Sequence, residues 1–257
     1  MKVLETVIDH ASDYIDLYDG SGYVASDYRP TIPQRFDITL ETAPRDLHLV
    51  HKKRRIVMWR RREAAQHIVV AGRATAAEMT RPVASTYPVE GRVVDSLGLF
   101  NPRRFSLTAG AGGGHAVALY RSPLGSAFET AGGILGAIAY EDETLASWAL
   151  LDVLVTPTVG APINFRAQAD AHGEFILPMN KLPQLNVAGT TYPAVLSVRT
   201  SGLSSDSIVD PENLTSVLVE EVENASSFVA TVNFTVVPGV VNKISSKDKA
   251  KIVVRPS

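Results

Sequence analysis

Short runs in which apolar and polar residues alternate constrain the fold of this chain more than any other sequence feature. Successive residues of a strand point to opposite faces of a sheet, so such runs predict strands with one buried face. Short strands separated by turn residues are typical of β-sandwiches and barrels. We predict strands over residues 36–41, 55–59, 67–72, 89–95, 105–110, 115–120, 148–156, 163–170, 174–179, 194–199, 216–222, 228–237 and 251–256.

Helical patterning is limited to two short segments, near Glu63 and Glu78. Neither segment is long enough to form a stable helix by itself. We therefore expect an all-β protein, built of small β-sandwich modules of transthyretin-like or immunoglobulin-like type with long loops and an irregular N-terminal arm.

The 257 residues leave room for two or three modules, each with its own core. We expect an N-terminal arm and basic β region over residues 1–85, and one sandwich over residues 86–190. Residues 191–257 hold about four predicted strands, which is few for an independent module. We expect this C-terminal β region to pack with the N-terminal region.

Charge and cysteine content exclude several classes of protein. The 25 basic and 27 acidic side chains give a net charge of -2, so the chain as a whole is not drawn to nucleic acid or to anionic membranes. The absence of cysteine excludes disulfides, thiolate metal sites and cysteine nucleophiles. Acidic residues at Glu5, Asp9 and Asp13 interrupt the apolar stretch that a secretion signal needs. We expect a protein made in the cytoplasm, with no membrane contact.

The segment from Asp170 to Gly173 carries the clearest turn signal. Aspartate can accept hydrogen bonds from nearby backbone N–H groups, and glycine tolerates a positive φ. Phe165 and Ala167 before the turn, and Phe175 and Leu177 after it, alternate in a way that lets them share a buried face. The pattern predicts a hairpin.

The stretch from Gln168 to Pro178, with the sequence Gly91 to Asp95 upstream, resembles the carboxypeptidase regulatory-like, transthyretin-like β-sandwich family. That family shows a Gly-x-Val-x-Asp strand and, later, a Thr-Asp-x-x-Gly-x-Phe hairpin. Here Ala169 stands in place of the threonine, and the insertion from Ala109 to Gly136 departs from the compact pattern. The resemblance covers about 105 residues and implies an accessory or assembly module with no catalytic residues.

Two segments allow an ion-binding interpretation that the pattern does not favour. Glycines from Gly110 to Gly114 could cradle a phosphate, but a strand follows them where a phosphate site needs a helix N-terminus. A flexible connecting loop, available as a contact surface, fits better. Asp13, Asp16 and Asp19 recur every third residue, whereas EF-hand ligands recur every second. A solvated acidic face is the better interpretation of these aspartates.

No arrangement of catalytic residues stands out. His48 and His51 would point to opposite faces of a strand, and no metal-binding spacing occurs elsewhere. No nucleophile motif is present, and the acidic clusters at Glu141–Glu143 and Glu220–Glu223 do not define an acid pair without a spatial distance. We expect a non-enzymatic protein with no cofactor, no metal and no small-molecule substrate.

Charge is strongly segregated along the chain. Residues 45–62 hold eight basic side chains and one acid, whereas residues 200–241 hold acids and no lysine or arginine. Complementary charge favours contact between regions or between copies. The partner-binding residues that we predict are Lys52, Lys53, Arg54, Arg55, Trp59, Arg60, Arg61 and Arg62. A solvated edge strand protected by its charges is the alternative, and a nucleic-acid interface is less favoured because Trp59 is the only aromatic residue there.

These features together are typical of a structural subunit of a phage virion, in the tail, baseplate or neck, or of a related contractile injection particle. We expect its partners to be other copies of itself and other virion proteins, held through sheet edges and complementary charge. A glycan- or ligand-binding module for host attachment is the alternative, with Tyr14, Tyr18, Tyr23 and Tyr28 as stacking residues. A polysaccharide hydrolase acting through Glu141 or Glu221 is a third hypothesis.

Overall fold

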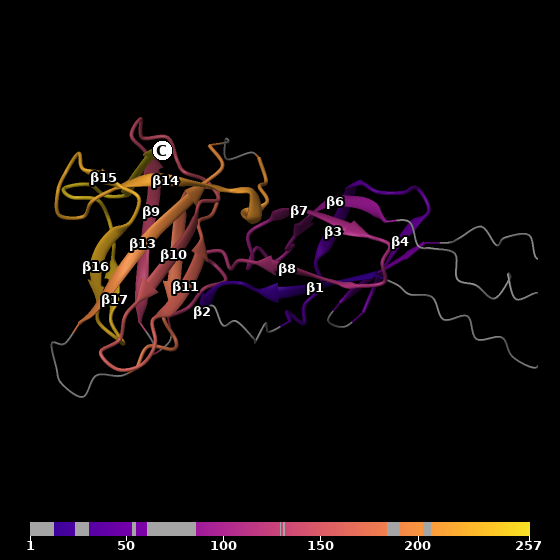
Figure 1. Cartoon of the computed structure of the whole chain (residues 1–257), viewed down its shortest axis with the longest axis horizontal. Coiled ribbons are helices and arrows are strands. Elements are labelled where there is room, and N and C mark those ends of the chain that lie inside the picture. Colours follow the sequence, from indigo (N-terminus) through magenta and orange to yellow (C-terminus); the bar gives the residue numbers. More distant parts are fainter. Residues whose placement is uncertain are drawn as a thin grey trace, which may run out of the picture.

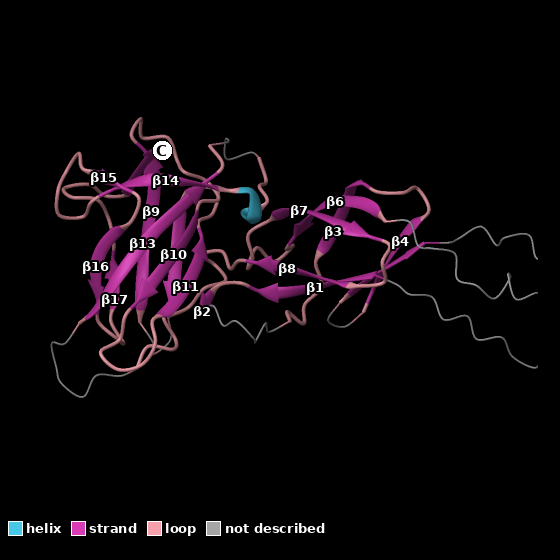
Figure 2. Ribbon diagram, in the orientation of Figure 1, coloured by secondary structure: helices cyan, strands magenta, loops and turns pink. Residues whose placement is uncertain are grey.

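The computed structural model is an all-β protein in two units (Figure 1). It describes residues 13–23, 31–52, 55–60, 86–128, 130, 132–183, 191–202 and 207–257. Within these ranges the only helical element is the single 3-10 turn η1 (Pro211–Asn213), at the boundary between the units (Figure 2). No helix in the same ranges has the length and apolarity to cross a bilayer. The predicted strand at 67–72 and the two helical segments near Glu63 and Glu78 fall outside the described residues.

The N-terminal unit packs two sheets against each other. One sheet is antiparallel, in the order β3 (Asp37–Thr42), β6 (Tyr87–Val94), β7 (Arg103–Ala109). The other has the order β4 (Leu47–His51), β5 (Ile56–Arg60), β1 (Asp13–Asp19), β8 (Gly114–Leu119), with β1 antiparallel to β5 and parallel to β8. Inward-facing side chains of both sheets form one core, which includes Ile15, Phe36, Met58, Val89 and Phe105.

The C-terminal unit is one long sheet that curls around a second core. Its main path is β12 (Glu174–Pro178), β9 (Gly133–Tyr140), β18 (Ile252–Pro256), β14 (Thr215–Glu220), β13 (Tyr192–Thr200), β10 (Leu150–Val155), β11 (Ile163–Gln168) and β2 (Gly22–Tyr23). Three further strands pair at its sides: β15 (Phe228–Val229), β16 (Val232–Val236) and β17 (Val241–Lys243). The core inside the curl includes Ile138, Leu151, Phe165, Phe175 and Val219.

The sheets do not follow the domain boundaries expected from the sequence. Strands β6, β7 and β8 belong to the N-terminal unit, while β9 to β12 belong to the C-terminal unit, so hydrogen bonding divides residues 86–190 between the two. Strand β13 pairs with β10, β18 pairs with β9, and β14 lies between β13 and β18. These strands therefore extend the C-terminal sheet rather than pair with the N-terminal region. Strand pairing over a long sequence separation depends on which faces bury each other, which a local pattern does not encode.

The turn from Asp170 to Gly173 forms as predicted, but the hairpin does not. The Asp170 carboxylate accepts hydrogen bonds from the N–H groups of His172 at 2.8 Å and Glu174 at 3.0 Å, and Gly173 has a φ of +74°. After this turn the strands separate, because β11 pairs with β10 and β2 while β12 pairs with β9. The turn is therefore an arch across the core, and the alternating residues on both sides of it share that core.

A third cluster joins the two units. Tyr120, Trp148, Leu150, Val209 and Leu214 are buried together there. At the same junction the Asn101 amide donates to the carbonyls of Gln168 and Ala169, at 3.1 and 3.2 Å. Burial raises the pKa of the Tyr120 hydroxyl, although the guanidinium of Arg166 partly opposes this rise. The junction is thus apolar and hydrogen-bonded.

Candidate interaction surface

The predicted basic segment lies on the β4–β5 pair of the N-terminal unit. The two strands are antiparallel, and the Lys52 N–H donates to the Arg55 carbonyl at 2.9 Å across the turn between them. Lys53, Arg54, Arg61 and Arg62 fall outside the described residues, and Arg60 is described only by its backbone at the end of β5. Lys52, Arg55 and Trp59 are the predicted partner residues whose side chains the structure places.

Arg55 and Trp59 both lie on the outer face of this sheet. The Arg55 guanidinium lies 4.0 Å from the centre of the Tyr14 ring and forms an ion pair with the Asp16 carboxylate at 3.2 Å. Trp59 packs against the His48 ring, with 5.6 Å between ring centres, and is 38% exposed. The outer face therefore combines aromatic surface with positive charge.

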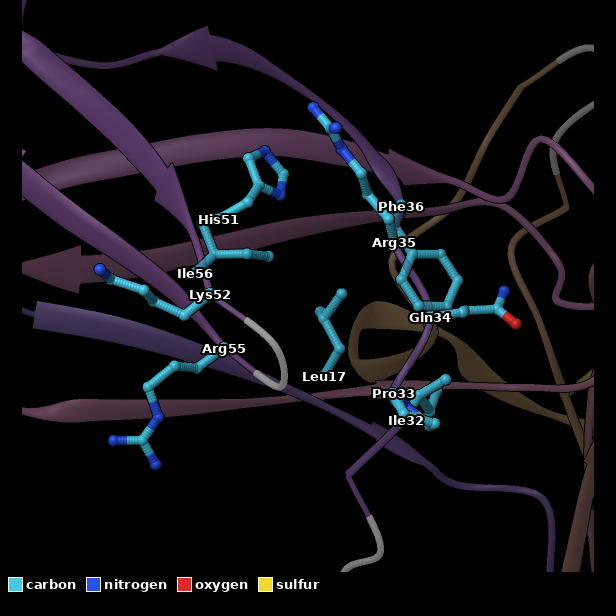
Figure 3. Close-up of a pocket in the computed structure, with 10 residues that line it drawn as sticks. All are labelled: Leu17, Ile32, Pro33, Gln34, Arg35, Phe36, His51, Lys52, Arg55 and Ile56. Carbon is cyan, nitrogen blue, oxygen red and sulfur yellow. The ribbon is translucent and has the colours of Figure 1, made fainter.

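A shallow pocket of about 280 Å³ opens beside the turn between β4 and β5. Leu17, Ile32, Phe36 and Ile56 give it apolar walls, and Figure 3 shows Leu17 between the side of Lys52 and Arg55 and the side of Phe36 and Gln34. The polar lining residues are Gln34, Arg35, His51, Lys52 and Arg55. Arg35 was not predicted as part of this surface, because it lies ten residues before the basic run and nothing local connects the two.

Part of the positive charge around this pocket is uncompensated. Arg55 is paired with Asp16, but across the ranges that the structure describes no acidic side chain pairs with Arg35, His51 or Lys52. We name the group Arg35, His51, Lys52 and Arg55 the basic rim. Uncompensated charge at a surface steers association with a partner of opposite charge.

The glycine-rich loop binds an anion, but the anion belongs to the chain itself. The Asp13 carboxylate accepts hydrogen bonds from the N–H groups of Gly110 at 2.7 Å and Gly113 at 3.1 Å, and His115 Nε2 lies 3.4 Å away. Asp13 is only 3% exposed. Backbone N–H groups from a glycine-rich turn do form anion sites, as the phosphate interpretation assumed, but a neighbouring strand fills this one.

The expectation of a solvated acidic face at Asp13, Asp16 and Asp19 is therefore wrong. Asp13 is buried in the loop, Asp16 pairs with Arg55, and Asp19 pairs with Arg121 at 2.7 Å. All three aspartates lie on β1, where their partners come from distant parts of the sequence. The spacing of the aspartates carried no information about those partners.

Of the acidic clusters, only Glu220 is buried. Its carboxylate accepts hydrogen bonds from Lys249 Nζ at 2.6 Å and from the Ser226 N–H at 2.7 Å. Burial by itself would raise the pKa of this carboxyl, but Lys249 and Ser226 outweigh burial and lower it. Glu141, Asp142 and Glu143 form an exposed turn, in which hydrogen bonds from Thr144 lower the pKa of Asp142.

The described part of the chain holds no group of three histidine, aspartate or glutamate side chains placed to bind a metal. Two of the tyrosines suggested for glycan stacking are partly buried by contacts within the chain: Tyr14 packs under Arg55 and against Gly114, and Tyr18 packs against the cluster that joins the two units. The side chain of Tyr23 and the whole of Tyr28 fall outside the described residues.

Comparison with known proteins adds no identity, since no family model, no curated protein and no solved structure matches this chain. The resemblance to the transthyretin-like family stays a prediction. The all-β architecture of small sandwich-like units is the part of the sequence analysis that the structure establishes.

Proposed function

We propose that this protein is a non-enzymatic structural subunit of a multi-protein particle, of the kind found in phage virions and contractile injection particles. Its location is then the virion, and its partners are other copies of the chain and other virion proteins. The basic rim is the observation that carries the proposal. Two of its members, the cations Arg35 and Lys52, have no acidic partner in the described residues, and they flank an apolar pocket on the surface.

The chemistry of this surface supports a protein partner. Positive charge around apolar walls suits a segment that carries both acidic and apolar side chains, since the charges orient it and the apolar groups bury surface. The pocket is shallow, and Leu17, Ile32 and Phe36 line it without converging acids or nucleophiles. A contact patch between proteins accounts for these residues better than a reaction site does.

The fold also suits a subunit that is held by neighbours. The junction cluster and the Asn101 hydrogen bonds join the two units, so that force applied to one is transmitted to the other. Strands at the sheet margins, such as β4 and β7, have a partner on one side only among the described strands. Unpaired strand edges are natural sites for addition of another chain's strand.

The proposal is tested by sedimenting material from the native source and locating this chain with an antibody. We expect the chain in a fast-sedimenting particle. Negative-stain microscopy of this fraction should show rings, tubes or plates. A variant with Arg35→Glu and Lys52→Glu should leave the particle fraction for the slow fraction, because it reverses the charge of the basic rim. Arg92→Glu, on the outer face of β6, is the matched control and should stay with the particle.

If the native chain sediments only as a free protein, the proposal is wrong. If the rim variant stays in the particle, the proposal of a particle subunit stands, but the basic rim is not the surface that contacts the neighbours.

A further inference from the structure

Among the described strands, the edges of the two N-terminal sheets are β3, β4, β7 and β8. For β7 and β4, the backbone directions show which groups the open edge presents. In an antiparallel pair, alternate residues direct their N–H and C=O groups toward the partner strand, and the others direct them away. The Arg104 N–H donates to the Val209 carbonyl at 2.9 Å, away from β6. Ser106 and Thr108 lie two and four residues after Arg104 on β7, so their backbone groups also point to the free edge.

One end of the β7 edge is already hydrogen-bonded to another segment of the same chain. The Val209 carbonyl accepts a hydrogen bond from the Arg104 N–H. At the same end of β7, the Arg103 guanidinium donates to the Ala118 carbonyl of β8 at 2.6 Å and to the Asp210 carboxylate at 2.5 Å. Beyond this point the segment turns away as η1. The rest of the β7 edge borders a groove of about 610 Å³ between β7 and β8, whose lining includes Leu107, His115 and Glu212.

The second open edge is β4. The Lys52 N–H donates to the Arg55 carbonyl. Val50 and His48 lie two and four residues before Lys52, so their backbone groups also point toward β5. Leu49 and His51 therefore direct theirs to the free edge. This edge ends at the basic rim, whereas the β7 edge ends at Glu212, whose carboxylate forms no ion pair among the described residues.

We propose that a second copy of this chain docks here, with the β4 edge of one copy adding antiparallel to the β7 edge of the next. This inference rests on the proposed function and names the partner of the same basic surface. Pairing Leu49 with Thr108 and His51 with Ser106 continues the sheet through backbone groups that have no hydrogen-bond partner among the described residues. The same register carries Lys52 toward Val209 and Glu212, so the opposite charges meet.

The contact joins two different surfaces of the same chain and is therefore head-to-tail. Such contacts close into a ring or continue as a filament, depending on the rotation between copies. Both forms are built by repetition of one subunit.

A charge exchange tests the pairing with the full chain. We expect wild-type protein to self-associate in sedimentation equilibrium between micromolar and millimolar concentrations. Glu212→Lys and Lys52→Glu, each alone, should weaken association at least about tenfold, because each places like charges at the contact. An equal mixture of the two variants should recover the association, because each then meets a partner of opposite charge on either surface.

A backbone substitution tests the strand addition separately. Thr108→Pro removes an N–H that points away from β6, so the native pairing is kept while the edge is blocked. It should weaken self-association at least about tenfold with little change in melting temperature. Thr235→Pro is the matched control, since Thr235 is an exposed residue of β16 whose N–H points away from β13, and it should associate as the wild type does.

Wild-type association that survives both Thr108→Pro and the charge variants overturns this pairing, yet leaves the proposed function standing. A wild-type chain that stays monomeric at millimolar concentration also overturns the inference. The proposed function is judged independently, by whether the native chain sediments with a particle.

Discussion

At the scale of single residues, Asp13 shows how a loop without charge can hold a buried anion. Its carboxylate is held by two backbone N–H groups of the glycine-rich loop, and this bond fixes the start of β1 against β8. Gly114 contributes by its lack of a side chain, since a Cβ there would lie 2.6 Å from the Tyr14 ring. The loop is thereby an anchor for the first described strand.

Asp13→Ala should lower the free energy of unfolding by about 2–4 kcal/mol, because it leaves two partly buried N–H groups without this acceptor. Urea denaturation of the purified chain measures this. Glu141→Ala removes an exposed acid and should change stability by about 0.5 kcal/mol or less. Equal effects of the two substitutions would show that the loop does not depend on the carboxylate.

Glu220 makes the stability of the fold depend on acid pH. Its pKa in the folded protein lies below the ordinary value of 4.5. The ionised carboxylate therefore stabilises the fold above the unfolded-state pKa, and this contribution is lost as the pH falls through the lower folded-state pKa.

Between neutral pH and about pH 3, wild-type protein should lose more unfolding free energy than Glu220→Gln, which cannot titrate. Denaturation curves at a series of pH values compare the two slopes. Lys249→Met, which removes the ion-pair partner, should also reduce the slope. A slope unchanged by Glu220→Gln would mean that other carboxylates account for the acid sensitivity.

At the scale of elements, the arch at Asp170–Gly173 connects two distant strands of the curled sheet through one tight turn. Two features of the turn require glycine at position 173. Its φ is +74°, and a Cβ there would lie 2.5 Å from the Ile138 carbonyl oxygen of β9. The Gly173 carbonyl also accepts a hydrogen bond from the Ile138 N–H at 2.8 Å. The turn therefore sets how closely the arch approaches β9.

Gly173→Ala should destabilise the protein by about 2–3 kcal/mol, since the strain of a positive φ adds to the steric clash. Gly202→Ala is a matched control, because Gly202 has a φ of +66° but a Cβ there meets no described atom within 4 Å. It should cost about 1 kcal/mol. Thermal denaturation measures both losses of stability. Equal losses would show that the backbone at Ile138 can shift to accommodate the Cβ at no cost in free energy.

Several strands follow the sequence pattern closely, whereas others do not. Alternation placed β6, β10, β13 and β14 within a few residues of their observed bounds. Strand β9, which pairs with β12, β17 and β18, was not predicted, because Gly132, Gly133 and Gly136 gave it the composition of a loop. The glycines are needed for close approach: a Cβ on Gly133 would lie 2.2 Å from the Leu177 carbonyl oxygen.

At the scale of the whole molecule, buried contacts shared between the two units lead us to expect that they unfold together. Arg103 is central to the junction, since its buried guanidinium binds Asp210 of the C-terminal region and Ala118 of β8. Around it, Tyr120, Trp148 and Leu150 bury apolar surface from both units. Cooperative unfolding depends on such shared buried contacts.

Calorimetry of the wild-type chain should therefore show one unfolding transition. Arg103→Ala leaves Asp210 without its partner and should cost about 3–5 kcal/mol, separating the transition into two. Adding Asp210→Asn to Arg103→Ala should recover part of this cost, because the unpaired charge is gone. Two transitions in the wild-type protein would show that the units unfold independently.

The sequence by itself determined the all-β class, most of the strands, the turn at Asp170–Gly173 and the concentration of positive charge after Arg45. These are local properties, set by alternation, by the φ preferences of glycine and by the order of charges along the chain. Only the tertiary structure decided that β1 fills the glycine-rich loop with Asp13, that Arg35 joins Lys52 and Arg55 around one pocket, and that β11 and β12 separate after their turn. Each of these depends on which distant segments bury the same core, and sequence neighbours carry no record of that choice.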